Sequence, residues 1–141
     1  MANVNASEYG RFAGGTGLIQ ANEQGGKLRA AYFSVNTTTQ AISSGDTVNL
    51  AVLPKGARIL GGFVSFGAMG ASATLKIGDS GSDVRLLAST DVSAAGTANI
   101  LAAAGFGYET TDVVTVIATA GGANYASAKD LKGVIFYSTA A

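Results

Sequence analysis

The chain of 141 residues contains no cysteine and no histidine, and these two absences exclude whole classes of chemistry. Without cysteine there is neither a disulfide framework nor a thiolate ligand, and without imidazole transition metals lose their other preferred ligand. A serine nucleophile would also lack the histidine base that activates it in serine hydrolases. We therefore expect a protein that is not an enzyme and needs no cofactor.

Charge is scarce as well, because only 13% of the residues are charged, and nine Lys and Arg residues balance nine Asp and Glu residues. An average globular protein has about 25% charged residues, and a net charge near zero favours association. No basic run marks a nucleic-acid site or a membrane-surface site. The uncharged stretch 92–108 is too short and too glycine-rich for a spanning helix. The composition thus favours protein partners over nucleic acid or membrane, with an ordinary neutral domain as the alternative.

The first 26 residues differ from the rest of the chain, since six glycines at positions 10, 14, 15, 17, 25 and 26 interrupt any periodicity. The large apolar residues of this segment are Tyr9, Phe12, Leu18 and Ile19. We predict an extended N-terminal arm, residues 1–26, whose apolar side chains contact a neighbouring subunit, followed by one domain, residues 27–141. The alternative is a loose terminus without contacts. The start lacks the features of a signal peptide, so we expect synthesis in a cytoplasm.

From residue 27 onward, β-branched and aromatic residues alternate with clusters of Gly, Ser, Asn and Asp at the spacing of strands and turns. The expected strands are 27–35, 47–53, 57–66, 73–77, 84–87, 97–101, 112–119 and 130–138. In the second of these, Val48, Leu50 and Val52 are predicted to share the buried face. Short helical turns at 71–73 or 93–95 are the only helix that we expect. The sequence predicts an all-β fold, an antiparallel β-sandwich or jelly roll of about eight strands.

Glycine and proline indicate how the strands are joined. In Leu53-Pro54-Lys55-Gly56, proline at the second position and glycine at the fourth favour a type I turn. The pair Gly61-Gly62 in the middle of a strand permits a bend, a bulge or the close approach of another backbone, and we favour a bend. The last strand ends almost at the C-terminus and is predicted to lie inside a sheet.

The segment 78–82 (GDSGS) resembles the sequence around the nucleophile of trypsin-like serine proteases, but without histidine we interpret it as a glycine-rich turn capped by Asp and Ser side chains. Asp79 and Asp83 also match the first positions of a calcium loop, although Thr90 occupies the twelfth position, where an acid is needed. A weak Ca²⁺ site that uses Asp79, Asp83 and Asp91 stays open as an alternative.

Three stretches carry a family resemblance: 47–64 (TVNLAVLPKGARILGGFV), 73–90 (ATLKIGDSGSDVRLLAST) and the closing 132–137 (KGVIFY). Together they resemble small virion structural proteins of tailed bacteriophages, of the head decoration or cement type. The resemblance implies a β-sandwich or jelly-roll subunit on the surface of the virion capsid, bound to the major capsid protein and commonly trimeric. The segment 1–26 has no firm counterpart in that pattern.

The leading hypothesis is therefore a homotrimeric capsid cement protein, which strengthens a shell through multivalent protein contacts and needs no catalytic group. One alternative is another virion component, such as a head fibre base, a tail protein or a connector protein. A second alternative, from a different class, is a carbohydrate-binding or receptor-binding β-sandwich.

Overall fold

The computed structural model describes residues 27–39, 41–100 and 107–139, and all the regular secondary structure in these ranges is β. The strands are β1 (Lys27–Asn36), β2 (Thr47–Leu53), β3 (Ala57–Phe66), β4 (Thr74–Gly78), β5 (Leu87–Asp91), β6 (Gly96–Asn99), β7 (Val114–Gly121) and β8 (Asp130–Thr139). The predicted all-β class is confirmed. The helical turns considered at 71–73 and 93–95 are wrong, because those residues form a turn and bends.

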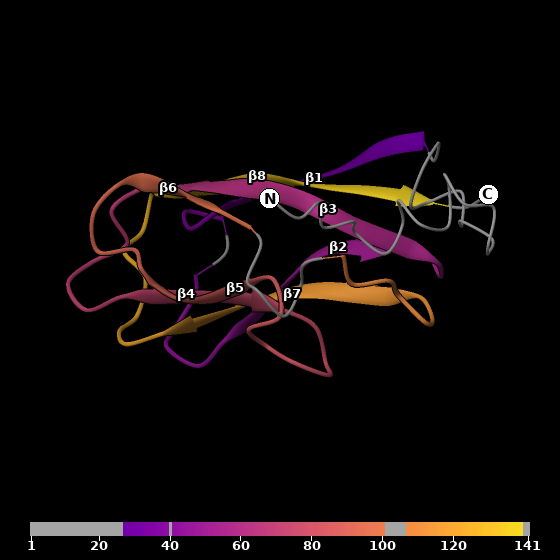
Figure 1. The fold of residues 1–141 in the computed structure, drawn as a ribbon. Coiled ribbons are helices and arrows are strands. Elements are labelled where there is room, and N and C mark those ends of the chain that lie inside the picture. Colours follow the sequence, from indigo (N-terminus) through magenta and orange to yellow (C-terminus); the bar gives the residue numbers. More distant parts are fainter. Residues whose placement is uncertain (1–26, 40, 101–106, 140–141) are drawn as a thin grey trace, which may run out of the picture.

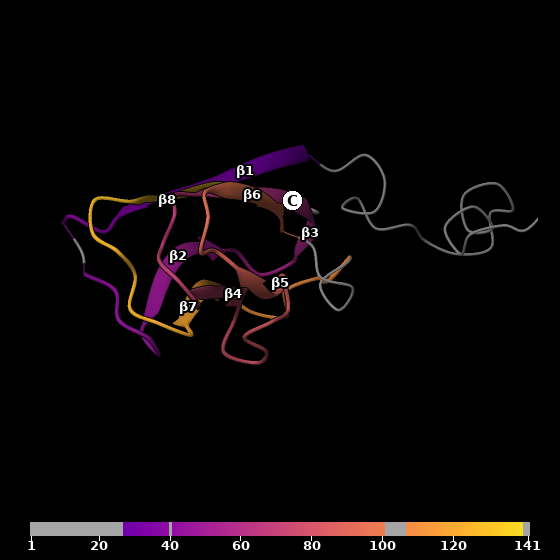
Figure 2. The ribbon, with the colours of Figure 1, turned by 90° about the vertical axis from the view of Figure 1, so that its left-hand side faces the viewer.

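The strands form two four-stranded sheets that lie face to face (Figure 1). Sheet A has the order β1-β8-β3-β6 and sheet B the order β2-β7-β4-β5, and every strand pair is antiparallel. Apart from β4 and β5, consecutive strands alternate between the sheets, which is the arrangement of a jelly roll. The last strand, β8, lies between β1 and β3, so the prediction of a C-terminal strand inside a sheet is confirmed. Figure 2 shows the two layers from the side, with β1 at the edge of sheet A.

The core fills the space between the sheets. Its fully buried large side chains include Leu53, Met69, Leu75, Ile77, Leu86, Ile100, Leu131 and Ile135. Leu75 and Ile77 of β4, and Ala73 just before it, are at most 1% exposed, so alternate residues of this segment face the core. No helix long and apolar enough to cross a membrane occurs in the described part of the chain.

A β-bulge in β2 limits the predicted buried face to Val48 and Leu50, which pack against the core. Asn49 pairs with Ile117 and Ala51 pairs with Val116, so Leu50 is an extra residue. Because side chains alternate with period two, one inserted residue moves every later side chain to the other face. Val52 is consequently 62% exposed, contrary to the prediction that it shares the buried face.

The pair Gly61-Gly62 adjoins a bulge, which bends the strand that contains it, and also allows the close approach of two backbones. The register of β3 against β8 shifts between Ile59 and Gly61, which leaves Leu60 as the extra residue. A Cβ atom on Gly62 would lie 2.2 Å from the carbonyl oxygen of Val134, and the φ of Gly62 is +158°. Glycine is therefore required at position 62 by both space and backbone conformation.

The reversal between β2 and β3 is also displaced from its prediction. The N–H of Ala57 donates to the carbonyl of Pro54 (3.3 Å), so the turn starts at Pro54, and Gly56, with φ +81°, occupies its third position. That conformation is typical of a type II turn, not of type I. Thr110 fixes it, because its hydroxyl donates to the Pro54 carbonyl (2.6 Å) and its own carbonyl accepts the N–H of Gly56 (2.9 Å).

The remaining strand predictions agree within two residues, except one. Residues 84–86 are not a strand, since the N–H of Arg85 donates to the carbonyl of Ser82 and the segment closes a turn before β5 begins at Leu87. The predicted strand 97–101 corresponds to β6, Gly96–Asn99, and its residue Leu101 lies outside the described residues.

Candidate protein-contact surface

The outer face of sheet A carries a row of apolar side chains across three strands. Tyr32 of β1 and Phe63 of β3 both pair in register with Val134 of β8, the strand between them. Tyr32 is 81% exposed and Phe63 is 49% exposed. Val134 is only 4% exposed although it lies outside the core cluster, as expected for a side chain between two large neighbours.

A second set of apolar residues extends this row toward the start of β1. The ring of Phe136 packs edge-on against Phe63, with their centroids 6.1 Å apart. The bulge in β3 exposes Leu60. On β1, Ala30 pairs with Phe136, and Leu28, two positions earlier in the chain, is 66% exposed. We define the outer patch by its members: Leu28, Tyr32, Leu60, Phe63, Val134 and Phe136.

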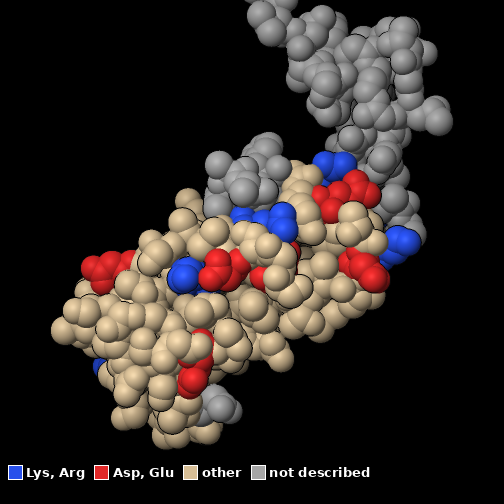
Figure 3. Space-filling view, turned by 90° about the horizontal axis from the view of Figure 1, so that it is seen from below, with Lys and Arg blue, Asp and Glu red and all other residues tan. Residues whose placement is uncertain are grey.

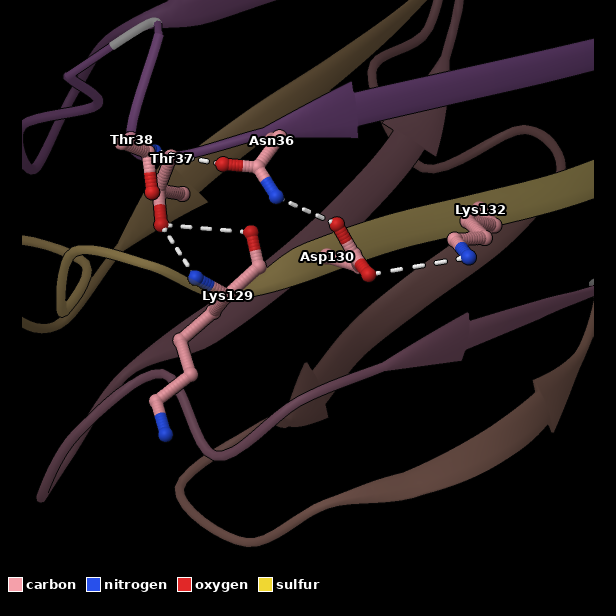
Figure 4. Close-up of polar contacts among 6 residues, drawn as sticks. All are labelled: Asn36, Thr37, Thr38, Lys129, Asp130 and Lys132. Carbon is pink, nitrogen blue, oxygen red and sulfur yellow. Dashed lines mark hydrogen bonds and ion pairs between the residues drawn. The ribbon is translucent and has the colours of Figure 1, made fainter.

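Polar residues border the outer patch at both ends of the sheet. At one end, the amide of Asn36 donates to Asp130 (2.6 Å), and Lys132 lies 3.6 Å from the same carboxylate (Figure 4). At the other end, Arg58 forms a 2.8 Å ion pair with Glu109. An apolar centre with a polar rim is the usual composition of a protein interface.

The rim near Asn36 is fixed by a buried threonine. The hydroxyl of Thr37 donates to the carbonyl of Ala126 (2.7 Å) and accepts the N–H of Lys129 (2.8 Å). The side chain of Asn36 in turn accepts the N–H of Thr38 (2.8 Å) (Figure 4). These bonds join the end of β1 to the loop before β8, so this side of the outer patch is held by two segments that are distant in sequence.

Charge is sparse and largely paired over the described surface. Seen from below the orientation of Figure 1, the surface is mostly uncharged, and basic atoms lie mainly beside acidic atoms (Figure 3). Large exposed apolar residues also occur at Val52 and Val113, near the start of β7 in sheet B, but the outer patch of sheet A has more of them.

The segment 78–82 forms the turn that the sequence predicted. One carboxylate oxygen of Asp79 accepts the N–H groups of Gly81 (2.9 Å) and Ser82 (3.0 Å), and the other accepts the Nε–H of Arg85 (2.8 Å). The guanidinium of Arg85 also lies 4.1 Å from the ring centre of Tyr108. The carboxylate of Asp79 thus caps the loop, as the sequence predicted for this segment.

The three acids considered for a Ca²⁺ site each have their own partner. Asp79 accepts hydrogen bonds from the loop backbone and from Arg85. Asp83 forms a 3.2 Å ion pair with Lys76, and Asp91 accepts the N–H of Ser93 (2.8 Å). That backbone bond, together with the Ser93 hydroxyl, holds the pKa of Asp91 below its usual value. No group of three or more His, Cys, Asp or Glu residues suited to a metal occurs among the residues that the structure describes. The geometry therefore does not favour the calcium alternative.

The contact residues predicted from the sequence, Tyr9, Phe12, Leu18 and Ile19, lie outside the described residues. The outer patch was not predicted, although part of its signal is present in the sequence. In β1, Tyr32 stands next to the buried Phe33, so strict alternation places one of the two aromatic rings on the outer face. The members of the patch on β3 and β8 could not be assigned to a face without knowing the bulge and the strand order.

Comparison with protein-family models and with curated protein sequences finds no match. Among solved structures, the chain is similar to a chain of the cyanophage Pam1 capsid asymmetric unit, with a TM-score of 0.66, 22% identity, and coverage of 81% of this chain and 86% of that chain. It is similar to a chain of the capsid of Ralstonia phage GP4, with a TM-score of 0.68, 22% identity, and coverage of 81% and 85%. A chain of the capsid of Helicobacter pylori bacteriophage KHP30 gives a TM-score of 0.58 and 18% identity, with coverage of 78% and 86%.

These likenesses establish a shared fold, because the identities are low while the coverage of both chains is high. High coverage in both directions also means that the matched chains are close to this one in length. The three matched chains are each found in a structure of a phage capsid.

Proposed function

We propose that the protein is a structural component of a tailed-phage virion that decorates and stabilises the capsid as a cement protein. The observation that carries the proposal is the outer patch, a contiguous apolar face that the fold of the described residues leaves uncovered. Large exposed apolar patches mark interaction sites in soluble proteins. The fold shared with small chains of three phage capsid structures supports a capsid as the partner.

A protein of this kind acts by contact area, without bond-breaking chemistry. Each subunit would place its outer patch against the major capsid protein, and repetition over the lattice would convert modest affinity per subunit into avidity. The scarcity of charge suits this role, because few charged groups have to be desolvated at the contact. In the same proposal, residues 1–26 add a second contact through Tyr9, Phe12, Leu18 and Ile19, and the subunits associate as trimers.

Copy number in the particle separates this function from the other virion roles. A cement protein should be present in proportion to the positions of the capsid lattice, whereas a tail or connector component is limited by the symmetry of one vertex. We expect quantitative mass spectrometry of purified particles to give a near-constant ratio of this chain to the major capsid protein. A ratio that corresponds to a few copies per particle would refute the cement function.

Removal of residues 2–26 tests the arm. The buried core begins at Phe33, so the truncated chain retains every core residue of the described part and should keep its fold. We expect truncation to abolish capsid binding while the circular-dichroism spectrum and the melting temperature change little. Full occupancy of the truncated chain on capsids would show that the arm is not a capsid contact.

A further inference from the structure

At one end of the sandwich β1 begins, β8 ends and the turn between β2 and β3 approaches them (Figure 1). A basic pocket lies among these segments. Its volume is about 320 Å³, and it is lined by Arg29, Pro54, Lys55, Tyr137 and Thr139. Arg29 and Tyr137 are cross-strand partners, so the guanidinium and the phenol project from the same face of sheet A. The pocket therefore combines two cations with an aromatic side chain and a proline.

Among the described residues, the two cations of this pocket have no acidic partner, unlike most of the other Lys and Arg residues. The ion pairs within the described residues engage Arg58, Lys76, Arg85 and Lys132. Of the remaining described cations, Arg29 and Lys55 line the pocket and Lys27 pairs in register with Thr139 at its border, whereas Lys129 lies elsewhere. Three of the four described cations without an ion pair thus lie in or beside this pocket.

The acids at this end do not neutralise the pocket within the described residues. Glu109 is engaged by Arg58 at 2.8 Å. One oxygen of Asp112 accepts the N–H of Val113 at 2.8 Å. Neither acid lines the pocket. Two like charges that face one cavity repel each other, and a bound anion relieves this repulsion.

We propose that this pocket binds a carboxylate side chain, Asp or Glu, of a protein partner, which in the proposed function is a capsid subunit. Arg29 supplies a fork of N–H donors that matches a carboxylate, and Lys55 adds a second positive charge. Pro54 and the ring of Tyr137 provide apolar walls for the aliphatic part of the acidic side chain. A nucleic-acid partner would need a longer basic track, and the balanced charge of the chain gives none.

The double variant Arg29→Gln/Lys55→Gln tests the proposal on capsids stripped of the native protein. We expect its affinity for the capsid to fall about 10-fold at about 0.05 M NaCl. At about 0.5 M NaCl, where screening weakens the wild-type contact, we expect the difference to shrink. The variant Lys76→Gln/Lys129→Gln is the matched control, because it makes the same change in net charge away from the pocket. The proposal is overturned if the Arg29 and Lys55 variant binds capsids as tightly as the wild type at low salt. It is also overturned if the control variant loses as much affinity as the Arg29 and Lys55 variant.

A direct titration separates this proposal from the proposed function on which its partner depends. Purified wild-type protein and the double variant are titrated with hexaglutamate peptide and, separately, with inorganic phosphate, while NMR follows the backbone N–H signals of Tyr137 and Thr139, which line the pocket in both proteins. We expect shifts with the peptide that are absent in the double variant. No shift with the peptide, or shifts with phosphate alone, overturns the assignment of a carboxylate ligand. If the wild type binds the peptide but not capsids, the pocket is upheld and the capsid function fails.

Discussion

Replacing Tyr32 by threonine tests the outer patch with little disturbance of the fold. Its ring is 81% exposed and Thr retains the strand preference of a β-branched residue, so the free energy of unfolding should change by no more than about 0.5 kcal/mol. Docking would instead bury most of the ring. Burying roughly 120 Å² of ring surface at about 25 cal/mol per Å² is worth about 3 kcal/mol, as an upper bound. The cost of ordering the interface reduces this value to about 1–2 kcal/mol, which corresponds to about a 5- to 30-fold loss of affinity.

The assay is sedimentation of stripped capsids over a series of protein concentrations, with the half-saturating concentration as the measured quantity. Val52→Thr is the matched control, because Val52 is 62% exposed and lies on the outer face of sheet B. We expect the Tyr32 variant to require the higher concentration and the Val52 variant to match the wild type. If Tyr32→Thr saturates capsids at the wild-type concentration, or if both variants are weakened equally, the outer patch is not the contact.

Three further predictions concern the fold. Gly62→Ala should lower the free energy of unfolding by about 2–3 kcal/mol, because its Cβ would lie 2.2 Å from the Val134 carbonyl oxygen. Gly96→Ala, whose Cβ would meet its nearest atom at 3.7 Å, is the control and should change the free energy of unfolding little. Equal urea midpoints for the two variants would contradict the prediction. Asp79→Ala should cost about 2–3 kcal/mol in the same assay, because it leaves an arginine and two backbone N–H groups without their acceptor. Burial raises the pKa of Tyr125 from 10.0 to about 12. Between pH 10 and 12 the unfolded chain loses the phenol proton and the folded chain keeps it, so the free energy of unfolding should fall as the pH rises. Tyr125→Phe should remove that decline.

The elements of the fold were largely predictable, whereas the faces of some strands were not. Runs of β-branched and aromatic residues between turn residues located β1, β2, β3, β4, β6, β7 and β8 within two residues. The failures occur where one residue interrupts the period. Leu50 and Leu60 are the extra residues of two bulges, and each reverses the alternation in a chain segment that is otherwise regular. Bulges depend on the partner strand, so a single strand sequence does not reveal them.

The turn predictions show the same limit at shorter range. The local preferences of Pro and Gly correctly placed a reversal at 53–56. The turn type, however, depends on Thr110, which is more than fifty positions away in the sequence and hydrogen-bonds to Pro54 and Gly56. The predicted strand 84–87 failed for a comparable reason. Asp79 and Arg85 form a 2.8 Å ion pair across the loop, and this contact outweighs the strand preference of Val84.

The apolar character of the outer patch is not required by the jelly roll itself. The core is complete between the sheets, and the alternation of β1 and β8 would be satisfied by polar side chains on the opposite face. Lys132 and Asp130 show that β8 does accept charged residues there, two and four positions before Val134. A soluble monomer would gain solubility from more charge at the positions of Tyr32, Phe63 and Phe136. Their apolar side chains therefore point to a requirement outside the described residues, which a capsid surface would supply in the function proposed above.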